Sequence, residues 1–449
     1  MDFPFLDKLA ARRRFGMRPG LQTTKALLEK IGNPQDALRF VHIAGTNGKG
    51  AVSAMISSIL ASAGYKTGRY TSPHLVSLNE RFQINSNPAD EITLASAAED
   101  VFHAVEELEK ETNYEVTFFE CLTAVAFLLF KRENADIVVL ETGLGGRLDA
   151  TNVIKDPLLS VITRIGIDHD EWLGSTHAAI ASEKAGIIKP GRPVVCGEMP
   201  EAAREVIARA ASLNGSDFVF APECISAEIL ESSLAGQTLK FTTAARNLAP
   251  VKLPLGGSFQ AENAVTALAA VDTLQKAAGL RIPDRAVIEG FSSVVWPGRF
   301  QLVCDNPPVL VDGAHNPDGA RALRDSLRYA NIQRPVGLVA GFCGDKDVLA
   351  NLRIMSAVSS CGWATPIDNP RSLPPDETAE RMIMSGFLEA KSCATLKDAL
   401  DQAMAWAKAC SGIVVVCGSL FLAGEALVEL GALKRGPVRE PNEKLAPDA

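Results

Sequence analysis

Hydrophobic and polar positions follow two different periods along the first half of the chain. Short apolar runs rich in β-branched residues, typical of buried strands, alternate with longer stretches in which apolar residues recur every three or four positions, typical of helices. The predicted strands are 40–43, 68–71, 137–141, 160–163 and 193–196. The predicted helices are 52–63, 93–112, 118–132, 175–185 and 201–213. This alternation predicts an α/β fold with a mostly parallel sheet covered by helices on both faces.

The pattern changes twice further along the chain. Between 218 and 255, short strands with turn signals predict a small antiparallel appendage, and two helices follow at 260–279 and 284–291. The run Trp296-Pro297-Gly298-Arg299 interrupts the pattern and predicts a domain boundary. Strand and helix signals then restart at 309–312, 319–329, 336–340, 396–408 and 413–417. We therefore expect one domain over 1–296, a smaller α/β domain over 297–436 and a disordered tail over 437–449.

Composition narrows the class of protein. Over 449 residues, 22% charged and 47% hydrophobic positions are typical of a soluble globular protein, and the net charge of −8 argues against a nucleic-acid-binding surface. Nine cysteines without a CxxC pair indicate free thiols in a reducing compartment. The longest apolar run, 122–130, is too short to span a membrane, and no apolar segment follows the three arginines 12–14, which we expect on the surface of an N-terminal helix. The expected location is the cytoplasm.

A glycine-rich turn carrying a lysine, Gly45-Thr46-Asn47-Gly48-Lys49-Gly50, joins the first strand to the helix that follows it. Glycines let the backbone curl around an anion, successive N–H groups and the helix N-terminus face it, and the lysine adds a point charge. The strict Walker spacing is not met, because Ile43 stands where its first glycine would be. A turn without a ligand is the alternative. With the rest of the chain, the arrangement predicts a nucleotide-phosphate site.

Polar residues also follow three other predicted strands. Ser72 follows 68–71, Glu141 ends 137–141, and Asp168-His169 comes after 160–163. The carboxyl ends of parallel strands meet at one edge of a sheet, so we expect these side chains near the phosphate loop. Ser72, Glu141 and His169 would together suit Mg²⁺. Singly, each also fits an ordinary role, as a turn-forming serine, a solvated carboxylate or a hydrogen-bonded core histidine.

Eight segments, in order along the chain, resemble the motifs of folylpolyglutamate synthase, the folate branch of the Mur-type, ADP-forming amide ligases. They are 45–50, 70–74, 140–152, 166–169, 183–187, 260–264, 297–299 and 312–316. The resemblance spans about residues 18–425, essentially the whole chain. The run Gly146-Arg147-Leu148-Asp149-Ala150 and its neighbours are similar to bacterial members that also act as dihydrofolate synthases.

The resemblance implies an N-terminal Mur-ligase-type P-loop domain, a smaller Rossmann-like glutamate-ligase domain, and chemistry driven by ATP. A folate or pteroate carboxylate attacks the γ-phosphate, and the amine of L-glutamate then displaces phosphate from the acyl phosphate. Both steps gather anionic oxygens, so the site needs cations where charge builds up. The implied partners are ATP, L-glutamate and dihydropteroate or a reduced folate, with neither nucleic acid nor membrane, and the implied state is a monomer.

The resemblance also assigns roles to residues. Lys49 and the loop Thr46, Asn47, Gly48 and Gly50 are implied to bind the β- and γ-phosphates. Two Mg²⁺ ions are expected, with Ser72, Glu141, His169 and Lys184 as the metal ligands. Lys184 is implied to carry a carbamate formed with CO₂, which turns a cation into a carboxylate-like ligand; the alternative is a surface lysine on a helix. The implied catalytic residues are Lys49, His169 and Lys184.

The C-terminal motifs are implied to complete the nucleotide site. Asn263 resembles the residue that contacts adenine, Arg299 reaches phosphate from the linker, and Asp312 and His315 resemble residues that fix the ribose and phosphates. Residues 312–316 also fit a plain strand-to-helix turn with an N-cap. Because the ATP ligands come from both sides of Trp296, we expect domain closure to assemble the active site.

The implied folate site is less sharply defined. Asp149 and Ala150 match the loop that contacts dihydropteroate in bifunctional relatives, and Phe119, beside Phe118, offers an aromatic face or a core residue. Arg81 and Arg147 offer local positive potential to an anionic substrate, or are solvated surface residues.

Two positions depart from the family pattern. Ala51 replaces the usual loop hydroxyl, and Phe259 stands where a histidine commonly precedes the adenine-site segment. The competing hypotheses are a Mur-type ligase acting on a cell-wall precursor and a nucleotide-binding protein without catalysis. The sequence leaves open which glutamylation step is catalysed, the polyglutamate length, the preferred folate, and whether the domains rest open or closed.

Overall fold

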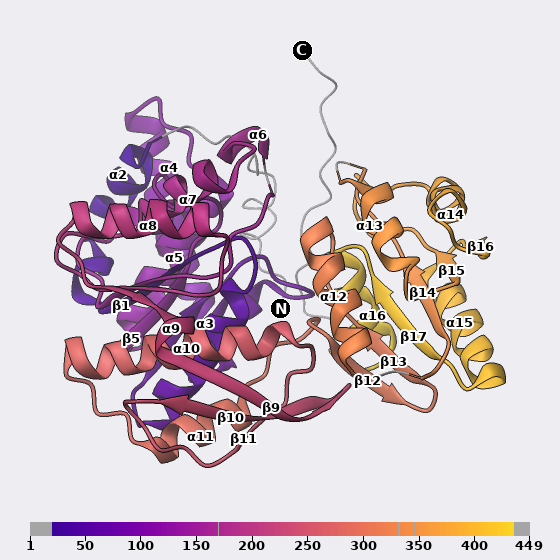
Figure 1. Cartoon of the computed structure of the whole chain (residues 1–449). Helices are drawn as coiled ribbons and strands as arrows, with labels where there is room; N and C mark the ends of the chain where they lie inside the picture. Colours follow the sequence, from indigo (N-terminus) through magenta and orange to yellow (C-terminus); the bar gives the residue numbers. More distant parts are fainter. Residues whose placement is uncertain (1–19, 169, 331–332, 345, 435–449) are drawn as a thin grey trace.

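The computed structural model describes residues 20–168, 170–330, 333–344 and 346–434. The protein is mixed α/β, with an N-terminal part, coloured indigo to salmon, beside a C-terminal part, coloured orange to yellow (Figure 1). Arg12 to Arg14, His169 and the predicted tail 437–449 lie outside the described residues. Within the described ranges, none of the helices has both the length and the hydrophobicity needed to cross a membrane.

A mostly parallel sheet of eight strands organises the N-terminal part. Its strands are β1 (Phe40–Ala44), β2 (Thr67–Tyr70), β3 (Phe82–Ile84), β4 (Asn87–Pro88), β5 (Ile137–Glu141), β6 (Leu159–Ile162), β7 (Val194–Cys196) and β8 (Phe218–Phe220). They lie in the order β4-β3-β2-β5-β1-β6-β7-β8, in which β3 is antiparallel to its two neighbours, β2 and β4, and the other pairs are parallel. The winding reverses around β1, because β2 and β5 lie on one side of it and β6 on the other. Loops leaving the carboxyl ends of β1, β5 and β6 therefore meet at a topological switch point, where ligands of such sheets bind.

Helices cover both faces of this sheet. They are α2 (Gln22–Lys30), α3 (Lys49–Ser62), α4 (Glu91–Glu111), α5 (Phe118–Arg132), α6 (Asp170–Leu173), α7 (His177–Ala185), α8 (Glu201–Leu213), α9 (Ala221–Cys224), α10 (Phe259–Ala278) and α11 (Asp284–Ser293). Short 3₁₀ turns are η1 (Pro34–Ala37), η2 (Leu78–Arg81) and η3 (Ala150–Val153).

Alternation along the strands sorts the core into two layers. In β5, Ile137 and Val139 pack with α3, α10 and α11, whereas Val138 and Leu140 pack with α4 and α5 on the opposite face. The contact of α3 with α11 is close, because a Cβ added to Gly290 would lie 2.4 Å from Cα of Ile59. The phosphate-loop helix is thus held firmly in the interior.

The predicted antiparallel appendage is confirmed, with one correction. It consists of β9 (Ile225–Ser233), β10 (Gly236–Thr243) and β11 (Val251–Leu253), in the order β11-β10-β9. The expectation that 218–255 forms it as a whole was wrong, because β8 pairs in parallel with β7 and extends the main sheet. The strand β8 is only three residues long, Phe-Val-Phe, and so short an apolar run does not indicate which of the two sheets it joins.

The C-terminal part is built on a second, six-stranded sheet. Its strands are β12 (Gln301–Asp305), β13 (Pro308–Val311), β14 (Val336–Ala340), β15 (Cys361–Ala364), β16 (Glu389–Ser392) and β17 (Ile413–Cys417). In the order β12-β13-β17-β14-β15-β16, all pairs are parallel except β12 with β13. Its helices are α12 (Pro317–Tyr329), α13 (Val348–Met355), α14 (Pro375–Met384), α15 (Leu396–Cys410) and α16 (Leu420–Glu429). Helices α15 and α16 cover one face, and α12, α13 and α14 cover the other.

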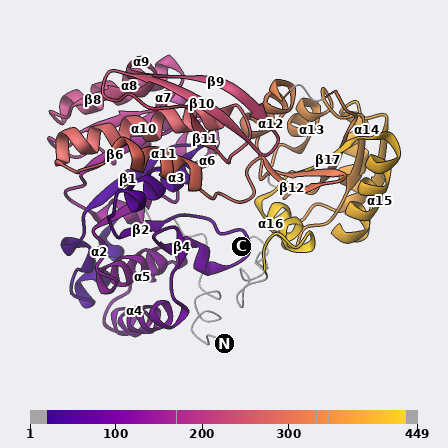
Figure 2. The ribbon, with the colours of Figure 1, turned by 90° about the horizontal axis from the view of Figure 1, so that it is seen from below.

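Several contacts hold the parts together, among them Leu75 against Gly424, and two more involve the linker and the β9–β10 hairpin. The ring of Trp296 lies on Gly50, where an added Cβ would be 2.0 Å from its Cζ2, and the guanidinium of Arg69 lies 5.4 Å from the same ring. The β9–β10 hairpin reaches toward β12 in both views (Figures 1 and 2), and Leu234 at its tip packs on the C-terminal core that contains Phe300. The linker is therefore anchored at the start of α3.

Candidate active site

The phosphate loop leaves β1 and starts α3. Gly48, at φ 88°, adopts the left-handed conformation that glycine tolerates, and Val52 N–H makes the first helical bond, to Gly48 O. The N–H groups of Lys49, Gly50 and Ala51 thus have no acceptor within the helix, an arrangement that suits an anion. The N–H groups of Thr46 and Asn47 instead donate to Arg164 O, at 2.9 and 3.2 Å. These two residues hold the loop in place through their backbone, and the helix start faces the site.

Lys184 extends from α7 toward this loop. Its side chain is only 3% exposed, and Nζ donates to Gly45 O at 2.7 Å. Burial, followed by the charge of Lys49, lowers the pKa of Lys184 to about 7. Lys184, predicted to be a carbamoylated metal ligand, lies buried beside the phosphate loop, so the alternative of a surface lysine on a helix was wrong.

Glu141 ends β5 beside the same loop. It is 3% exposed, and burial raises its pKa to about 7, although the nearby charges of Lys49 and Arg299 act in the opposite direction. The backbone N–H of Ser72 donates to this carboxylate, yet its Oε2 has no hydrogen-bond partner among the described residues. A buried carboxylate oxygen without a protein partner is costly unless a cation occupies the position next to it. The chemistry of this oxygen fits a hard divalent metal.

The predicted metal ligands are only partly described. Ser72 is half-buried in the loop after β2, and His169 lies outside the described residues. Within the described ranges, no three His, Cys, Asp or Glu side chains come together as a metal site. The predicted set of metal ligands includes Ser72 and a modified Lys184, and neither residue belongs to these four types.

The loop after β5 is organised by Asp149. Its Oδ2 accepts from the N–H groups of Gly143 and Leu144, both at 2.9 Å, and its Oδ1 accepts from Thr151 N and Oγ1, at 3.0 and 2.5 Å. The buried ring of His42 lies 2.9 Å from Thr151 Oγ1 through Nε2. Both oxygens of Asp149 are therefore committed to shaping the loop that was predicted to meet dihydropteroate.

The same loop is fastened to the helix that carries Lys184. Arg147 donates from its backbone N–H to Glu183 O at 2.8 Å, and its guanidinium pairs with the Glu183 carboxylate at 2.9 Å. Asn152 Nδ2 donates to both Arg147 O and Gly186 O at 3.0 Å. Arg147, predicted to provide positive potential, is thus an exposed residue already paired with the neighbour of Lys184.

The remaining predicted folate residues lie around β2 and α5. Arg81 is buried, donates from Nε to His74 Nδ1 at 2.9 Å, and lies 5.7 Å from the Phe118 ring. Phe119 is half-buried, with its ring close enough to Gly143 that an added Cβ would be 2.5 Å away. Ala150 is buried at the start of η3. Phe119 and the Asp149 loop are thus brought together at Gly143, and Arg81 lies over the ring of the neighbouring Phe118.

The C-terminal residues approach from the linker and from the loop after β13. Asp312 accepts from the N–H groups of Phe300 and Ala314, both at 2.7 Å, and so fixes the turn that follows the linker. The partly buried side chain of Arg299 lies near both Asp312 and Glu141, and its guanidinium donates to Gly298 O at 3.0 Å. His315 Nδ1 lies 2.8 Å from Gly313 O, and burial lowers its pKa.

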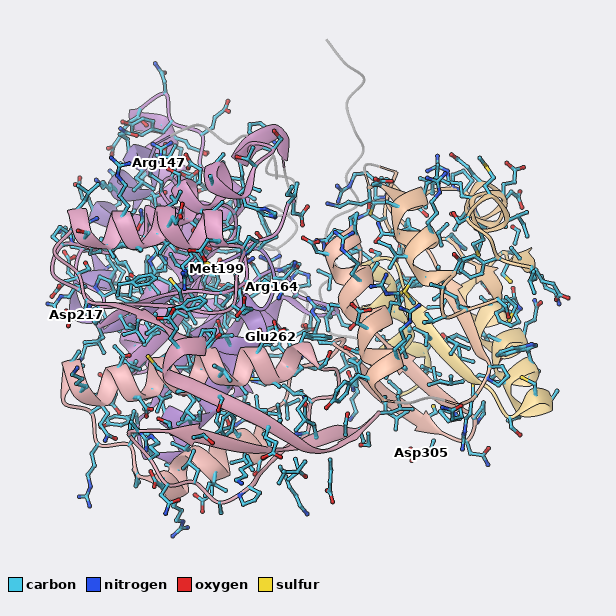
Figure 3. The ribbon with its side chains drawn as sticks, in the orientation of Figure 1. Arg147, Arg164, Met199, Asp217, Glu262 and Asp305 are labelled. Atoms are coloured by element: carbon cyan, nitrogen blue, oxygen red, sulfur yellow. The ribbon has the colours of Figure 1, made fainter. Side chains whose placement is uncertain are left out.

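Asn263, which was predicted to contact adenine, lies next to the phosphate loop. A Cβ added to Gly48 would lie 2.4 Å from Asn263 Oδ1, and Asn263 Nδ2 donates to Gln260 Oε1 at 2.9 Å. Nearby, Arg164 pairs with Glu262 at 3.0 Å; Figure 3 labels both, on the side of the N-terminal part that faces the C-terminal part.

Some residues of the site were missed from the sequence. Arg69, in β2, is 2% exposed and contributes positive charge near Glu141. An arginine inside an apolar strand pattern is itself a signal, because buried charges need partners. Lys346, 3.7 Å from Asp168, gave no comparable signal, since it lies in a loop with ordinary polarity.

Family models match both parts of the chain. The Mur ligase middle domain matches residues 43–271, and the Mur ligase glutamate ligase domain matches residues 298–420. The chain is 34% identical to the dihydrofolate synthase/folylpolyglutamate synthase of Bacillus subtilis (strain 168), over 91% of this chain and 94% of that protein. It is 33% identical to the folylpolyglutamate synthase of Lacticaseibacillus casei, over 94% of this chain and 95% of that protein.

Solved structures agree with these matches. The Mycobacterium tuberculosis folylpolyglutamate synthase complexed with ADP has a TM-score of 0.87 and 32% identity, covering 95% of this chain and 97% of that one. Escherichia coli FolC in complex with DHPP and ADP has a TM-score of 0.83 and 32% identity, with the same coverage.

Proposed function

The chain belongs to the Mur ligase family, in the branch of folylpolyglutamate and dihydrofolate synthases, and from this we propose that it joins L-glutamate both to dihydropteroate and to the glutamyl tail of reduced folates. The reaction class is that of an ADP-forming acid–amino-acid ligase using ATP. The observation that carries the residue-level proposal is the meeting of Lys49, Lys184, Glu141 and Arg299 at the switch point of the first sheet.

In the first step, a substrate carboxylate oxygen attacks the γ-phosphorus, and the bond from that phosphorus to the β-phosphate oxygen breaks to release ADP. Lys49 and the free N–H groups at the start of α3 are proposed to bind the β- and γ-phosphates. Arg299, beside Glu141, adds positive charge from the linker. In the second step, the glutamate amine attacks the carbonyl carbon, the carbon–oxygen bond to phosphate breaks, and the amine loses a proton.

We propose that Glu141, Ser72 and His169 hold Mg²⁺. Support comes from the buried Glu141 Oε2, which the protein leaves without a hydrogen bond. When bound, the metal neutralises phosphate charge and orients the γ-phosphoryl group. The positive charges of Arg69, Lys49 and Arg299 stabilise the ionised form of the buried Glu141 carboxylate.

We further propose that Lys184 carries a carbamate and is the ligand of a second Mg²⁺. A neutral amine is the form that adds to CO₂, and a lysine with a pKa near 7 supplies it at neutral pH. The reaction joins the Lys184 nitrogen to the CO₂ carbon and releases one proton. It also replaces a cation next to Lys49 by an anion, which removes the repulsion between the two side chains.

The acceptor is proposed to lie against the loop shaped by Asp149. Phe119 faces Gly143 at the start of this loop and offers an aromatic face to a pterin or benzoyl ring. Ala150 completes the loop, while Arg81 and Arg147 are proposed to attract the anionic acceptor. Because the Asp149 oxygens accept four hydrogen bonds from the loop, its contribution is to the shape of the acceptor site.

The nucleotide site is proposed to draw on both parts of one chain, divided at Trp296–Arg299. Asn263 and the phosphate loop come from one side, and Asp312 and His315 come from the other. A site completed within a single chain supports a monomer as the working unit, which sedimentation of the purified protein tests.

The test of the two activities is ADP formation with Mg²⁺, ATP and L-glutamate, comparing 7,8-dihydropteroate with tetrahydrofolate as acceptor. We expect ADP release with both, together with glutamylated products identified by mass. Activity with tetrahydrofolate alone would make the protein a chain extender and overturn the assignment of the Asp149 loop to dihydropteroate.

A further inference from the structure

The loop that follows β6 contacts the phosphate loop on one side. Arg164 O accepts from the N–H groups of Thr46 and Asn47, at 2.9 and 3.2 Å, and Gly166 O accepts from Thr46 Oγ1 at 3.0 Å. Three hydrogen bonds thus fix the position of one loop relative to the other. A displacement of residues 164–166 would be passed directly to the turn that starts α3.

On its other side the same loop contacts the C-terminal part. Asp168 Oδ2 accepts from Asn316 Nδ2 at 2.9 Å, and Asp168 Oδ1 lies 3.7 Å from Lys346 Nζ. His315 Nε2 is 4.0 Å from the same carboxylate. Gly166 also lies against the start of α12, since an added Cβ would be 2.2 Å from Asp318 Oδ2. A single N-terminal loop therefore contacts residues from two C-terminal loops and the helix that follows one of them.

Asn316 is held in one orientation by bonds at both ends of its amide. Its Oδ1 accepts from Gly319 N–H at 2.7 Å and caps α12, while its Nδ2 donates to Asp168. A hydrogen bond to a carboxylate in a partly buried position is stronger than one between neutral groups. The amide thus ties the direction of α12 to the loop after β6.

We propose that Asp168 and Asn316 form an interdomain clasp that positions the phosphate loop in response to the C-terminal part. Both are positioning residues, acting through the loop 164–168 on Thr46, Asn47 and, by sequence adjacency, on His169. The inference rests on the proposed function for its kinetic consequence. Its structural consequence, the relative placement of the two parts, stands independently of catalysis.

The test exchanges the two polar groups of the pair. Asn316→Asp keeps an oxygen to cap α12 but places a second carboxylate against Asp168, so the clasp becomes repulsive. Asp168→Asn removes the negative charge that accepts the hydrogen bond from Asn316. The double variant D168N/N316D restores one hydrogen bond with the donor and acceptor exchanged. Asp100→Asn, which disturbs a surface pair with Arg132 within the N-terminal part, is the matched control.

The test uses a functional and a structural readout. The functional readout is kcat, measured together with the Kd for ADP, and the structural readout is the radius of gyration from small-angle scattering without ligand. We expect Asn316→Asp to lower kcat about tenfold or more while the Kd for ADP changes by less than about threefold. Its radius of gyration should rise. The double variant should return both kcat and the radius of gyration toward their wild-type values. The control should match wild type throughout.

The clasp is overturned if Asn316→Asp keeps the wild-type scattering profile and kcat, or if the double variant fails to recover the scattering profile. Should the wild-type protein show no ligase activity, the proposed function fails, and the scattering arm still decides the clasp. Recovery in the double variant separates a paired contact from a general loss of folding, because a merely structural defect at either position would add in the double variant.

Discussion

Lys49 and Lys184 donate to the same acceptor, the carbonyl oxygen of Gly45, from 3.1 and 2.7 Å. Two ammonium groups on one carbonyl repel each other, and the more deeply buried one loses its proton more readily. Burial first, and then the charge of Lys49, lower the pKa of Lys184 to about 7 at the place where the nucleotide phosphates are proposed to bind. The arrangement is consistent with the proposal that Lys49 binds phosphate while Lys184 reacts as an amine.

Replacement of Lys184 tests the carbamate. Lys184→Ala should lose most ligase activity, since the proposed second metal loses a ligand, and should regain part of it when a short carboxylic acid such as acetate is added. Steady-state ADP formation measures both effects, with chloride at equal ionic strength as the salt control. Lys184→Arg, which keeps a charge but forms no carbamate under these conditions, should be inactive as well. Wild-type activity in Lys184→Ala would remove the basis for the modification.

The contact of Trp296 with Gly50 should make that glycine sensitive to a single methyl group. Gly50→Ala would place Cβ 2.0 Å from Cζ2 of the indole, so the ring and the linker that leads to Arg299 must shift. We expect a lower kcat and a loss of about 1–3 kcal/mol in the free energy of unfolding, typical of overpacking. Combining the change with Trp296→Phe, which shortens the ring, should recover much of both, with Trp296→Phe alone as the reference. A Gly50→Ala protein with wild-type kcat would show that the linker is not anchored there.

The buried His42 should make stability depend on pH. Burial lowers the pKa of His42 from 6.5 to about 3, so between these values the unfolded chain binds a proton that the folded protein does not. Stability is therefore lost as pH falls below 6.5, by up to about 1.4 kcal/mol per pH unit for this one group. His42→Gln keeps a donor toward Thr151 but cannot titrate. Urea unfolding should thus show the wild-type advantage over His42→Gln shrinking as pH falls, and a constant difference would contradict the prediction.

Ala51 is the departure in the phosphate loop that is simplest to test. It lies buried in the first turn of α3, where the backbone N–H groups remain available for phosphate. Ala51→Ser should therefore change turnover by no more than a few-fold at saturating Mg²⁺, as measured by ADP release. A large gain would mean that a hydroxyl at this position contributes a contact that the backbone does not replace.

Several elements follow directly from the sequence. Helix α5 begins with a capping box, in which Thr117 and Glu120 satisfy each other's backbone N–H groups, and ends in charged residues, so its predicted bounds 118–132 are confirmed. The buried strand β5 is likewise confirmed at both ends, because its apolar run stops at Glu141. In these segments, local chemistry and tertiary packing favour the same structure.

Other elements carry too little local signal. Strand β16, Glu389–Ser392, consists of Glu-Ala-Lys-Ser and lies mostly exposed at a sheet edge, where pairing with β15 alone defines it. The strands β12 and β15 and the helices α13, α14 and α16 were missed as well. The roles of Asp149 and Asn316 also depend on partners distant in the chain, or on loop geometry, that no residue pattern specifies. The motifs predicted candidate site residues, while the hydrogen bonds that organise their surroundings required the fold.

The central claim, that a carboxylate is activated as an acyl phosphate, is tested most directly by the fate of its oxygen. The acceptor folate is labelled with ¹⁸O in the carboxylate that receives glutamate, and the phosphate released during turnover with ATP and L-glutamate is analysed by mass. Because the carboxylate oxygen bonds to the γ-phosphorus and leaves with it, the account predicts one ¹⁸O atom in each phosphate. Phosphate without the label, formed alongside glutamylated product, would contradict it.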